Sequence, residues 1–228
     1  MNADNLQKHI LATYINLRIG MAIIGIVFPV LLYVGGRFYG LPLQDSMSAY
    51  YHALIDGKSM RDFFVGILFA LGVFLYLYKG YTNRENIALN FAGAFAIGIA
   101  IFPMEWNCGS NCSNISVHGV CAVSFFLAIA YVSIWRSSDT LPLIKDEKTR
   151  ARYRNTYRAM GFAMLASPLT ALVLTLFFQN AKSYNYFVEL AGVWAFSGYW
   201  FLKSRELKES SADRRAVESQ LDIDAPPR

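Results

Sequence analysis

The chain has 228 residues, a formal net charge of +5, a hydrophobic share of 55% and a mean hydropathy of +0.31. Soluble domains of this length are usually less apolar, so the composition argues against that class and favours an integral membrane protein. The apolar residues also lie in blocks, each close to the roughly 20 residues that a helix needs to cross a bilayer.

Six apolar segments predict six transmembrane helices, because backbone groups in lipid must find their hydrogen bonds within the spanning element. No pattern of a cleaved signal peptide precedes the first segment. Residues 1–204 are therefore predicted to form one domain, an all-α integral membrane bundle. Residues 205–228 carry charges of both signs and are predicted to form a solvated, partly disordered tail. The six segments are residues 17–37, 62–80, 86–104, 116–135, 158–178 and 184–202.

Small residues interrupt the second and third of these segments. Gly66 and Gly72 lie in the second, and several alanines and glycines lie between residues 92 and 100 in the third. Small residues let helix backbones approach closely, so we expect the third segment to be central in the bundle.

The Lys and Arg residues predict the orientation in the membrane, because cytoplasmic loops carry an excess of them. Of the 21, 17 fall on the side of the two termini, which we therefore expect in the cytoplasm. The location expected is the cell membrane, with a bacterial inner membrane as the simplest host. Membrane lipids are expected partners and nucleic acid is not, whereas the oligomeric state stays open. The four residues on the other side are Arg37, Lys58, Arg61 and Lys182.

Two of the three cysteines lie on the predicted outer side, in the sequence "EWNCGSNCSN". Cys108 and Cys112 are four residues apart and are candidates for a small disulfide loop in an oxidising compartment. Cys121 falls inside an apolar segment and is expected to be a core residue.

A polar stretch, "SMSAYYHALIDGKSMRD" (46–62), separates the first two apolar segments. Ionisable side chains at or within a membrane are costly, so they are candidates for function. The topology brings several such residues from different segments to the outer face. These candidates are Ser48, His52, Asp62 and His118, with Glu105 and Glu189 as additional ones.

Two histidines and a carboxylate together predict a site for Zn or another divalent cation. Asp62 either binds the metal with His52 and His118 or activates a bound water as a general base. Ser48 precedes His52 by four residues, so on an α-helix the two would share a face. There its hydroxyl would support a bound water or an oxyanion.

Each of these residues also has a structural interpretation. An interfacial histidine is often only hydrogen-bonded, and Tyr50 and Tyr51 are typical of an aromatic belt at a membrane interface. Asp62 suits the first turn of a helix, where a carboxylate satisfies free N–H groups. Glu189 could pair with Arg37 or Lys182. The residue types also allow a Ser-His-Asp hydrolase triad, although no nucleophile-elbow sequence is present.

The segment "SAYYH" (48–52), followed by Asp62 at the opening of an apolar helix, resembles the Ser-x-x-x-His…Asp pattern of the alkaline ceramidase and progestin/adipoQ-receptor superfamily. The resemblance implies a zinc-dependent lipid-amide hydrolase in which Ser48 supports the site, His52 binds zinc and Asp62 positions the water. The chain departs from that family in having six predicted helices rather than seven. It also lacks a late His-x-x-x-His pair, since no histidine follows His118.

The segments "RDFFVGILFALGVFLYLYKGY" and "LNFAGAFAIGIAIFP" resemble uncharacterised bacterial six-helix membrane proteins, which suggests a host but no activity. The hypothesis favoured by the sequence is a metal-dependent membrane hydrolase of a lipid amide or ester at the outer leaflet. One alternative is a non-enzymatic scaffold, sensor or lipid-binding protein. The other is a small transporter or channel with Glu189 as its coupling acid.

Overall fold

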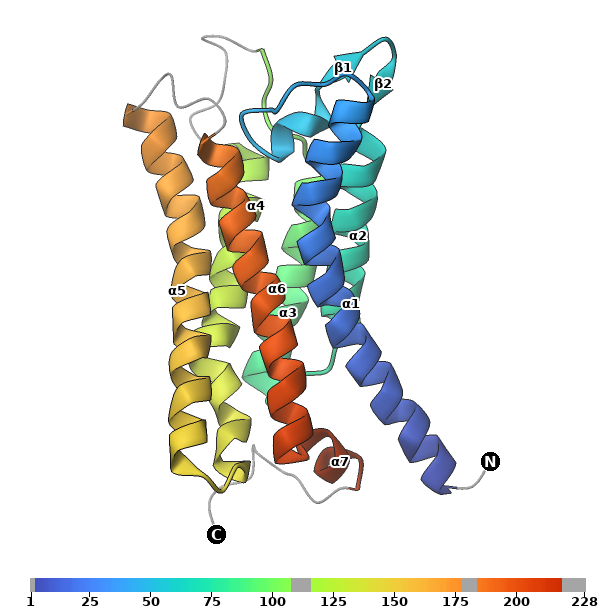
Figure 1. Ribbon diagram of the computed structural model, residues 1–228, viewed down its shortest axis with the longest axis vertical. Coiled ribbons are helices and arrows are strands. Elements are labelled where there is room, and N and C mark those ends of the chain that lie inside the picture. Colours follow the sequence, from blue (N-terminus) through green and yellow to red (C-terminus); the bar gives the residue numbers. More distant parts are fainter. Residues whose placement is uncertain (1–2, 108–115, 178–183, 219–228) are drawn as a thin grey trace.

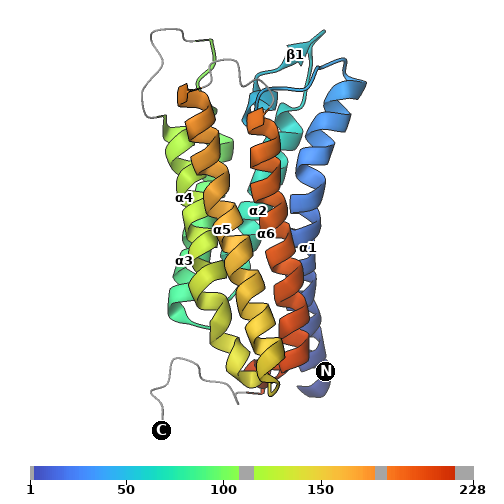
Figure 2. The same ribbon diagram turned by 60° about the vertical axis from the view of Figure 1, so that its left-hand side comes forward.

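The computed structural model describes residues 3–107, 116–177 and 184–218. Six long helices run side by side in an elongated bundle (Figure 1), and a turned view shows α5 and α6 next to each other at the front (Figure 2). The all-α fold predicted from the sequence is confirmed. The long helices are α1 (Ala3–Phe38), α2 (Arg61–Leu77), α3 (Asn83–Ile101), α4 (Val117–Tyr131), α5 (Glu147–Phe177) and α6 (Tyr184–Ser210).

Three helical segments in the described part of the chain are long and apolar enough to cross a membrane. They are Asn5–Phe38, Val117–Leu143 and Glu147–Leu174. The second of these joins α4 to a π-helical turn, η3 (Val132–Arg136), and a 3-10 helix, η4 (Ser137–Leu143). These segments support the class of membrane protein that the composition predicted.

Several helices extend further into polar sequence than hydropathy predicted. α1 begins at Ala3 and α5 at Glu147, about 14 and 11 residues before the predicted starts. At the other terminus, α6 continues to Ser210, and a short helix, α7 (Ala212–Val217), folds back against the bundle. Within the predicted tail, residues 205–210 and 212–217 are helical, and Glu206, Leu207 and Ala212 are buried, whereas most of the other side chains are exposed or half-buried. Residues 219–228 lie outside the described part.

The connection between α1 and α2 forms a cap over one end of the bundle, which we call the hairpin end (Figure 1). It contains a 3-10 helix, η1 (Ser48–Tyr51), and a hairpin of β1 (Leu54–Ile55) and β2 (Lys58–Ser59). Asp56 and Gly57 form its two-residue turn, with φ of 50° and 75°. Asp-Gly suits the positive φ angles that such a turn needs. The opposite end, where α1 begins and α7 lies, is called the α7 end.

Two glycines let α2 and α3 touch backbone to backbone. A Cβ added to Gly72 would lie 2.8 Å from the carbonyl oxygen of Gly93, and one added to Gly93 would lie 2.6 Å from that of Gly72. Both distances are too short for a real side chain. Small residues thus let α2 and α3 approach closely, as expected, whereas Gly66 on α2 faces open space. The predicted central position of the third segment is not observed, because α3 packs mainly against α2 and α4 and leaves Ile87 and Phe91 more than half exposed.

The sequence suggested that the two tyrosines before His52 belong to an aromatic belt at the membrane interface. The structure instead packs both of them against the bundle. Tyr50 is fully buried and packs against Gly36, where a Cβ would come within 2.8 Å of the tyrosine ring. Tyr51 is half-buried, and the guanidinium of Arg61 lies over its ring at 4.7 Å. The cap is therefore fixed to the bundle by aromatic packing.

Candidate functional site

A cavity of about 300 Å³ lies inside the bundle near the hairpin end. This is the lower end of the range of about 300–1,000 Å³ that is usual for small-molecule sites. All six long helices contribute to its wall, which is mostly aromatic and aliphatic. Its polar lining residues are Ser46, Ser48, His118, Ser167, Asn185 and Glu189.

Ser48 and His118 are hydrogen-bonded to each other at the cavity. The serine Oγ lies 2.9 Å from Nε2 of the imidazole, and Nδ1 lies 2.9 Å from the carbonyl oxygen of Phe102. A carbonyl oxygen can only accept, so Nδ1 carries the proton and donates a hydrogen bond to the Phe102 carbonyl. Nε2 of the neutral ring then presents its lone pair to the Ser48 hydroxyl. This geometry allows His118 to act as a base toward Ser48.

Local structure explains why Ser48 meets His118 and not His52. The hydroxyl of Ser116 accepts a hydrogen bond from the backbone N–H of Gly119 (3.0 Å), which fixes the first turn of α4 and with it His118. Ser48 begins a 3-10 helix with three residues per turn. Residues four apart in such a helix point about 120° away from each other. The prediction that Ser48 and His52 share a helix face is therefore wrong.

Glu189 on α6 holds the segment that leads into Ser48. Its carboxylate accepts a hydrogen bond of 2.7 Å from the backbone N–H of Met47, and the backbone N–H of Tyr186 donates to the carbonyl of Asp45 (3.1 Å). Two turns of α6 thus fix residues 45–47. The partner of Glu189 is this backbone rather than the predicted Arg37, and Lys182 lies outside the described residues. Its role in the structure is to position Ser48.

His52 lies beside the site but does not line the cavity. Its Nε2 is 2.8 Å from the carbonyl oxygen of Met104, and its ring stacks on Trp106 with centroids 5.3 Å apart. The two histidines therefore hold alternate carbonyls of one segment, those of residues 102 and 104. His52 supports the stretch that orients His118.

Of the three predicted carboxylates, Asp62 and Glu105 do not line the cavity of the Ser48–His118 pair, whereas Glu189 does. Asp62 is exposed in the first turn of α2, where it suits the helix dipole, and it does not line the cavity. Glu105 is half-buried after α3 and also lies outside the lining. Within the described ranges, no three His, Cys, Asp or Glu side chains come together as a metal site. Zinc or another divalent cation stays a prediction, and Cys108 and Cys112 lie outside the described residues.

The α7 end holds a network of buried charges that sequence reasoning missed. Lys203 is 1% exposed, and its ammonium donates to the Glu206 carboxylate (2.8 Å), the Thr140 hydroxyl (2.7 Å) and the carbonyl of Ser137 (3.2 Å). The sequence counted this lysine as a loop charge. The available signal was its spacing of three residues from Glu206, which puts both on one helix face.

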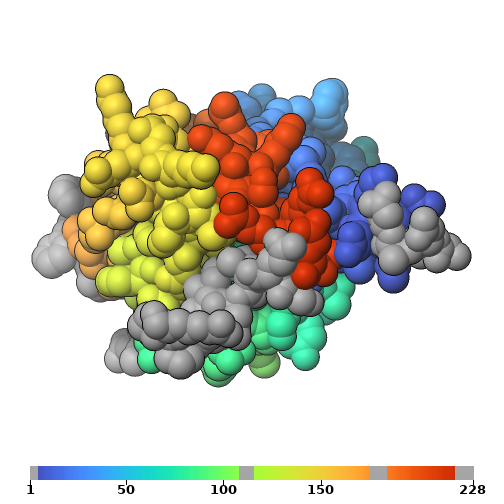
Figure 3. Space-filling model, turned by 90° about the horizontal axis from the view of Figure 1, so that it is seen from below, coloured from blue at the N-terminus to red at the C-terminus, as the bar shows by residue number. Residues whose placement is uncertain are grey.

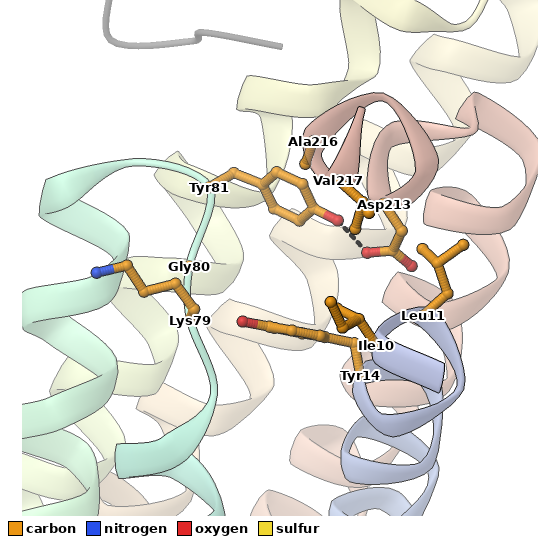
Figure 4. Close-up of a pocket in the computed structure, with 9 residues that line it drawn as sticks. All are labelled: Ile10, Leu11, Tyr14, Lys79, Gly80, Tyr81, Asp213, Ala216 and Val217. Atoms are coloured by element: carbon orange, nitrogen blue, oxygen red, sulfur yellow. Dashed lines mark hydrogen bonds between the residues drawn. The ribbon is translucent and has the colours of Figure 1, made fainter. Parts of the chain in front are cut away.

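Arg18 and Asp213 form the second part of this network and join α1 to α7. The guanidinium donates to both carboxylate oxygens, at 3.0 and 2.5 Å, and the Tyr81 hydroxyl donates to the same carboxylate (Figure 4). Burial, followed by the neighbouring Tyr78 and Asp213, raises the pKa of Tyr81 well above its usual value. The hydroxyl therefore keeps the proton that it donates.

A second cavity, of about 260 Å³, adjoins this ion pair between α1, the turn after α2 and α7. Tyr14 and Tyr81 extend toward it from opposite sides, whereas the ammonium of Lys79 points away from the other lining residues (Figure 4). Seen from this end, the last turns of α6 and α7 fill the space between α5 and α1 (Figure 3). The carboxylate of Asp213 beside this cavity is already hydrogen-bonded to Arg18 and Tyr81, so its charge is compensated within the protein.

Comparison with known proteins adds no relative. No family model, no curated protein and no solved structure matches this chain. The argument for function therefore depends on the chemistry of Ser48, His118 and the cavity that they line.

Proposed function

We propose that the protein is a multi-pass membrane hydrolase that cleaves an acyl ester or amide of a lipid, with Ser48 as nucleophile and His118 as general base. One observation carries the proposal: the Ser48 hydroxyl is 2.9 Å from Nε2 of His118, and both side chains line a cavity. This distance lies within the range of about 2.6–3.2 Å expected for a base and its proton donor.

The chemistry follows the usual course of acyl transfer. Ser48 Oγ attacks the carbonyl carbon of the substrate while its proton passes to Nε2 of His118. The Phe102 carbonyl, which accepts from Nδ1, stabilises the resulting imidazolium. His118 then gives the proton to the leaving alcohol or amine. A water, deprotonated by His118, attacks the acyl group on Ser48. The bond between the acyl carbon and Ser48 Oγ then breaks, His118 returns the proton to Oγ, and the acid is released.

Stabilisation of the oxyanion needs a donor in the same cavity. Asn185 lines it and carries an amide of the type that stabilises tetrahedral intermediates. Removing one such donor in other hydrolases costs about 100- to 1,000-fold in rate.

The proposal uses the histidines differently from a zinc site. Both ring nitrogens of His118 are already hydrogen-bonded, to Ser48 and to Phe102. A metal at His118 would have to displace one of these partners. Proton transfer uses the hydrogen bonds as they stand, and His52 then serves the segment that orients His118.

We further propose that all six long helices span the membrane, with both termini in the cytoplasm and the hairpin end outside. The excess of Lys and Arg on the side of the termini supports this orientation. The helix ends agree with it, since α1 begins and α7 lies at the same end of the bundle (Figure 1). A bacterial inner membrane is the simplest host.

Covalent labelling tests the proposal. The purified protein in lipid nanodiscs is treated with an alkyl fluorophosphonate, which modifies activated serines. We expect Ser48→Ala to abolish labelling and His118→Gln to slow it by about 100-fold or more. Ser167→Ala is the matched control, because that hydroxyl faces the same cavity but donates to the carbonyl of Val188 (2.9 Å).

Equal labelling of the wild type and Ser48→Ala would refute the assignment of the nucleophile. No labelling of a correctly folded wild type, together with a loss of stability in Ser48→Ala, would instead favour a non-enzymatic protein in which the pair is structural.

A further inference from the structure

We infer that the cavity takes one acyl chain of a membrane lipid, which enters sideways from the bilayer between α4 and α5. The chain lies along the apolar depth of the cavity, with its polar head at Ser48 and His118. The placement of the reacting carbonyl at Ser48 depends on the proposed function, whereas the entry and binding of the chain do not.

The first argument is the position of the cavity opening. Val123 on α4 and Leu172 on α5 line the cavity, and 44% and 54% of their surfaces are exposed, so the cavity is open beside these two residues. Each lies five or six residues from the hairpin end of its helix, which is about 8–9 Å along the axis. Both belong to segments apolar enough to cross a membrane. The opening therefore faces the hydrocarbon region rather than the water above the bundle.

The second argument is the size of the side chains at this opening. Gly119 and Ala122 on α4 face the cavity, and Pro168 and Ala171 do so on α5. These are small residues on the two helices that border the opening. Pro168 also removes one N–H from the hydrogen bonds of α5, which weakens the regular helix at this point. The sequence of both helices thus leaves room for a narrow chain to pass.

The third argument is the separation of polar and apolar lining. Most polar lining residues come from the cap or from the hairpin ends of α4 and α6, near His118 in the first turn of α4. Ser167 lies deeper on α5, but its hydroxyl donates to the carbonyl of Val188. Phe125 lies seven residues further along the same helix, about 10 Å deeper, together with Leu68 and Val193 from neighbouring helices. A molecule that matches this lining has a polar head and a single apolar chain at least about 10 Å long.

Photocrosslinking tests the binding without requiring any reaction. The Ser48→Ala protein is reconstituted in phosphatidylcholine vesicles that contain a lipid with a diazirine in the middle of one acyl chain. We expect adducts on Phe125, Leu68 and Val193, which line the cavity and are buried within the bundle. Adducts found only on outward-facing residues such as Phe91 and Leu127 would overturn the inference.

A filled cavity provides the second test. Ala122→Phe places a ring inside the cavity, whereas the matched control Ala128→Phe places it on the same helix in a shallow depression between α3 and α4. We expect Ala122→Phe to reduce adducts in the cavity at least about tenfold and Ala128→Phe to leave them unchanged. Equal adducts in both variants would contradict the inference.

The same two variants separate this inference from the proposed function. In the protein with an intact Ser48, Ala122→Phe should slow labelling by dodecyl fluorophosphonate about tenfold more than labelling by ethyl fluorophosphonate. If both reagents react equally in all variants, the acyl-chain inference fails and the hydrolase proposal survives. If neither labels Ser48 while crosslinks appear in the cavity, the hydrolase proposal fails and the acyl chain stands.

Discussion

Substitution of Asp213 by alanine gives the sharpest test of the α7 end. Arg18 is 0% exposed and its partner Asp213 is 13% exposed, so removing the carboxylate leaves a buried positive charge without its counter-ion. Breaking such a buried pair costs about 3–5 kcal/mol. Because Asp213 is slightly exposed and water can reach the site, we expect a loss of about 3 kcal/mol in the free energy of unfolding. The Tyr78 hydroxyl, 3.4 Å from Arg18, cannot supply the missing charge.

The measurement is reversible unfolding in mixed micelles, as a double-mutant cycle. Arg18→Met with Asp213→Leu replaces both charges by apolar groups, and such replacements are often neutral or stabilising. Tyr81 loses an acceptor in this variant, which costs about 1 kcal/mol. We therefore expect the free energy of unfolding of the double variant to lie within about 1 kcal/mol of the wild-type value. This loss is much smaller than the sum of the losses in the two single variants.

An exposed ion pair beside α7 supplies the control. Arg214 and Glu218 are 2.9 Å apart, and the arginine side chain is 74% exposed. Pairs of this kind contribute about 0–1 kcal/mol, so Glu218→Ala should be nearly silent. A cost below about 1 kcal/mol for Asp213→Ala, or additive effects of the two charge-removing substitutions, would refute the argument that this pair fixes α7 to α1.

Two further predictions concern the middle of the bundle and the cap. Gly72→Ala should lower the free energy of unfolding by about 1–3 kcal/mol in the same assay, because the added Cβ would meet the backbone of α3. Gly66→Ala, in open space on the same helix, should be neutral or stabilising by up to about 1 kcal/mol. Glu189→Ala should slow fluorophosphonate labelling of Ser48, because it releases the segment that precedes the serine. Glu189→Gln should retain most of the labelling rate, because its amide oxygen can still accept from the backbone N–H of Met47. Equal rates in the two variants would contradict the positioning role.

The centres of the six long helices were predictable from the sequence, because each is an apolar block near the length of a membrane span. Their extents were not. The residues from 147 to 157 in α5 are polar, but they continue a helix whose N-terminus is capped by Asp146, which accepts from the backbone N–H of Thr149 at 2.9 Å. Hydropathy identifies the apolar part of a helix and not the polar turns that extend from it.

The candidate site was predictable as a set of residues but not as an arrangement. Ser48, His118 and Glu189 were identified because ionisable or nucleophilic groups at a membrane face are rare. Their contacts depend on a 3-10 turn and on a carbonyl in the connection after α3, and neither leaves a hydropathy signal. The pair of Arg18 and Asp213 was beyond reach for a simpler reason, since 195 residues separate its members.

The cavity beside Ser48 and His118 is large enough to affect the stability of the bundle. Residual cavities in protein interiors cost about 24 cal/mol per Å³, so a gap of about 300 Å³ corresponds to as much as about 7 kcal/mol. That is comparable to the whole stability of a typical domain, about 5–15 kcal/mol. An acyl chain that enters from the bilayer, as we infer, would fill the space and remove most of this cost. At the α7 end the protein buries paired charges, and we expect substitutions there to affect stability. Beside Ser48 and His118 it has a cavity that an acyl chain could fill, and we expect substitutions there to affect chemistry.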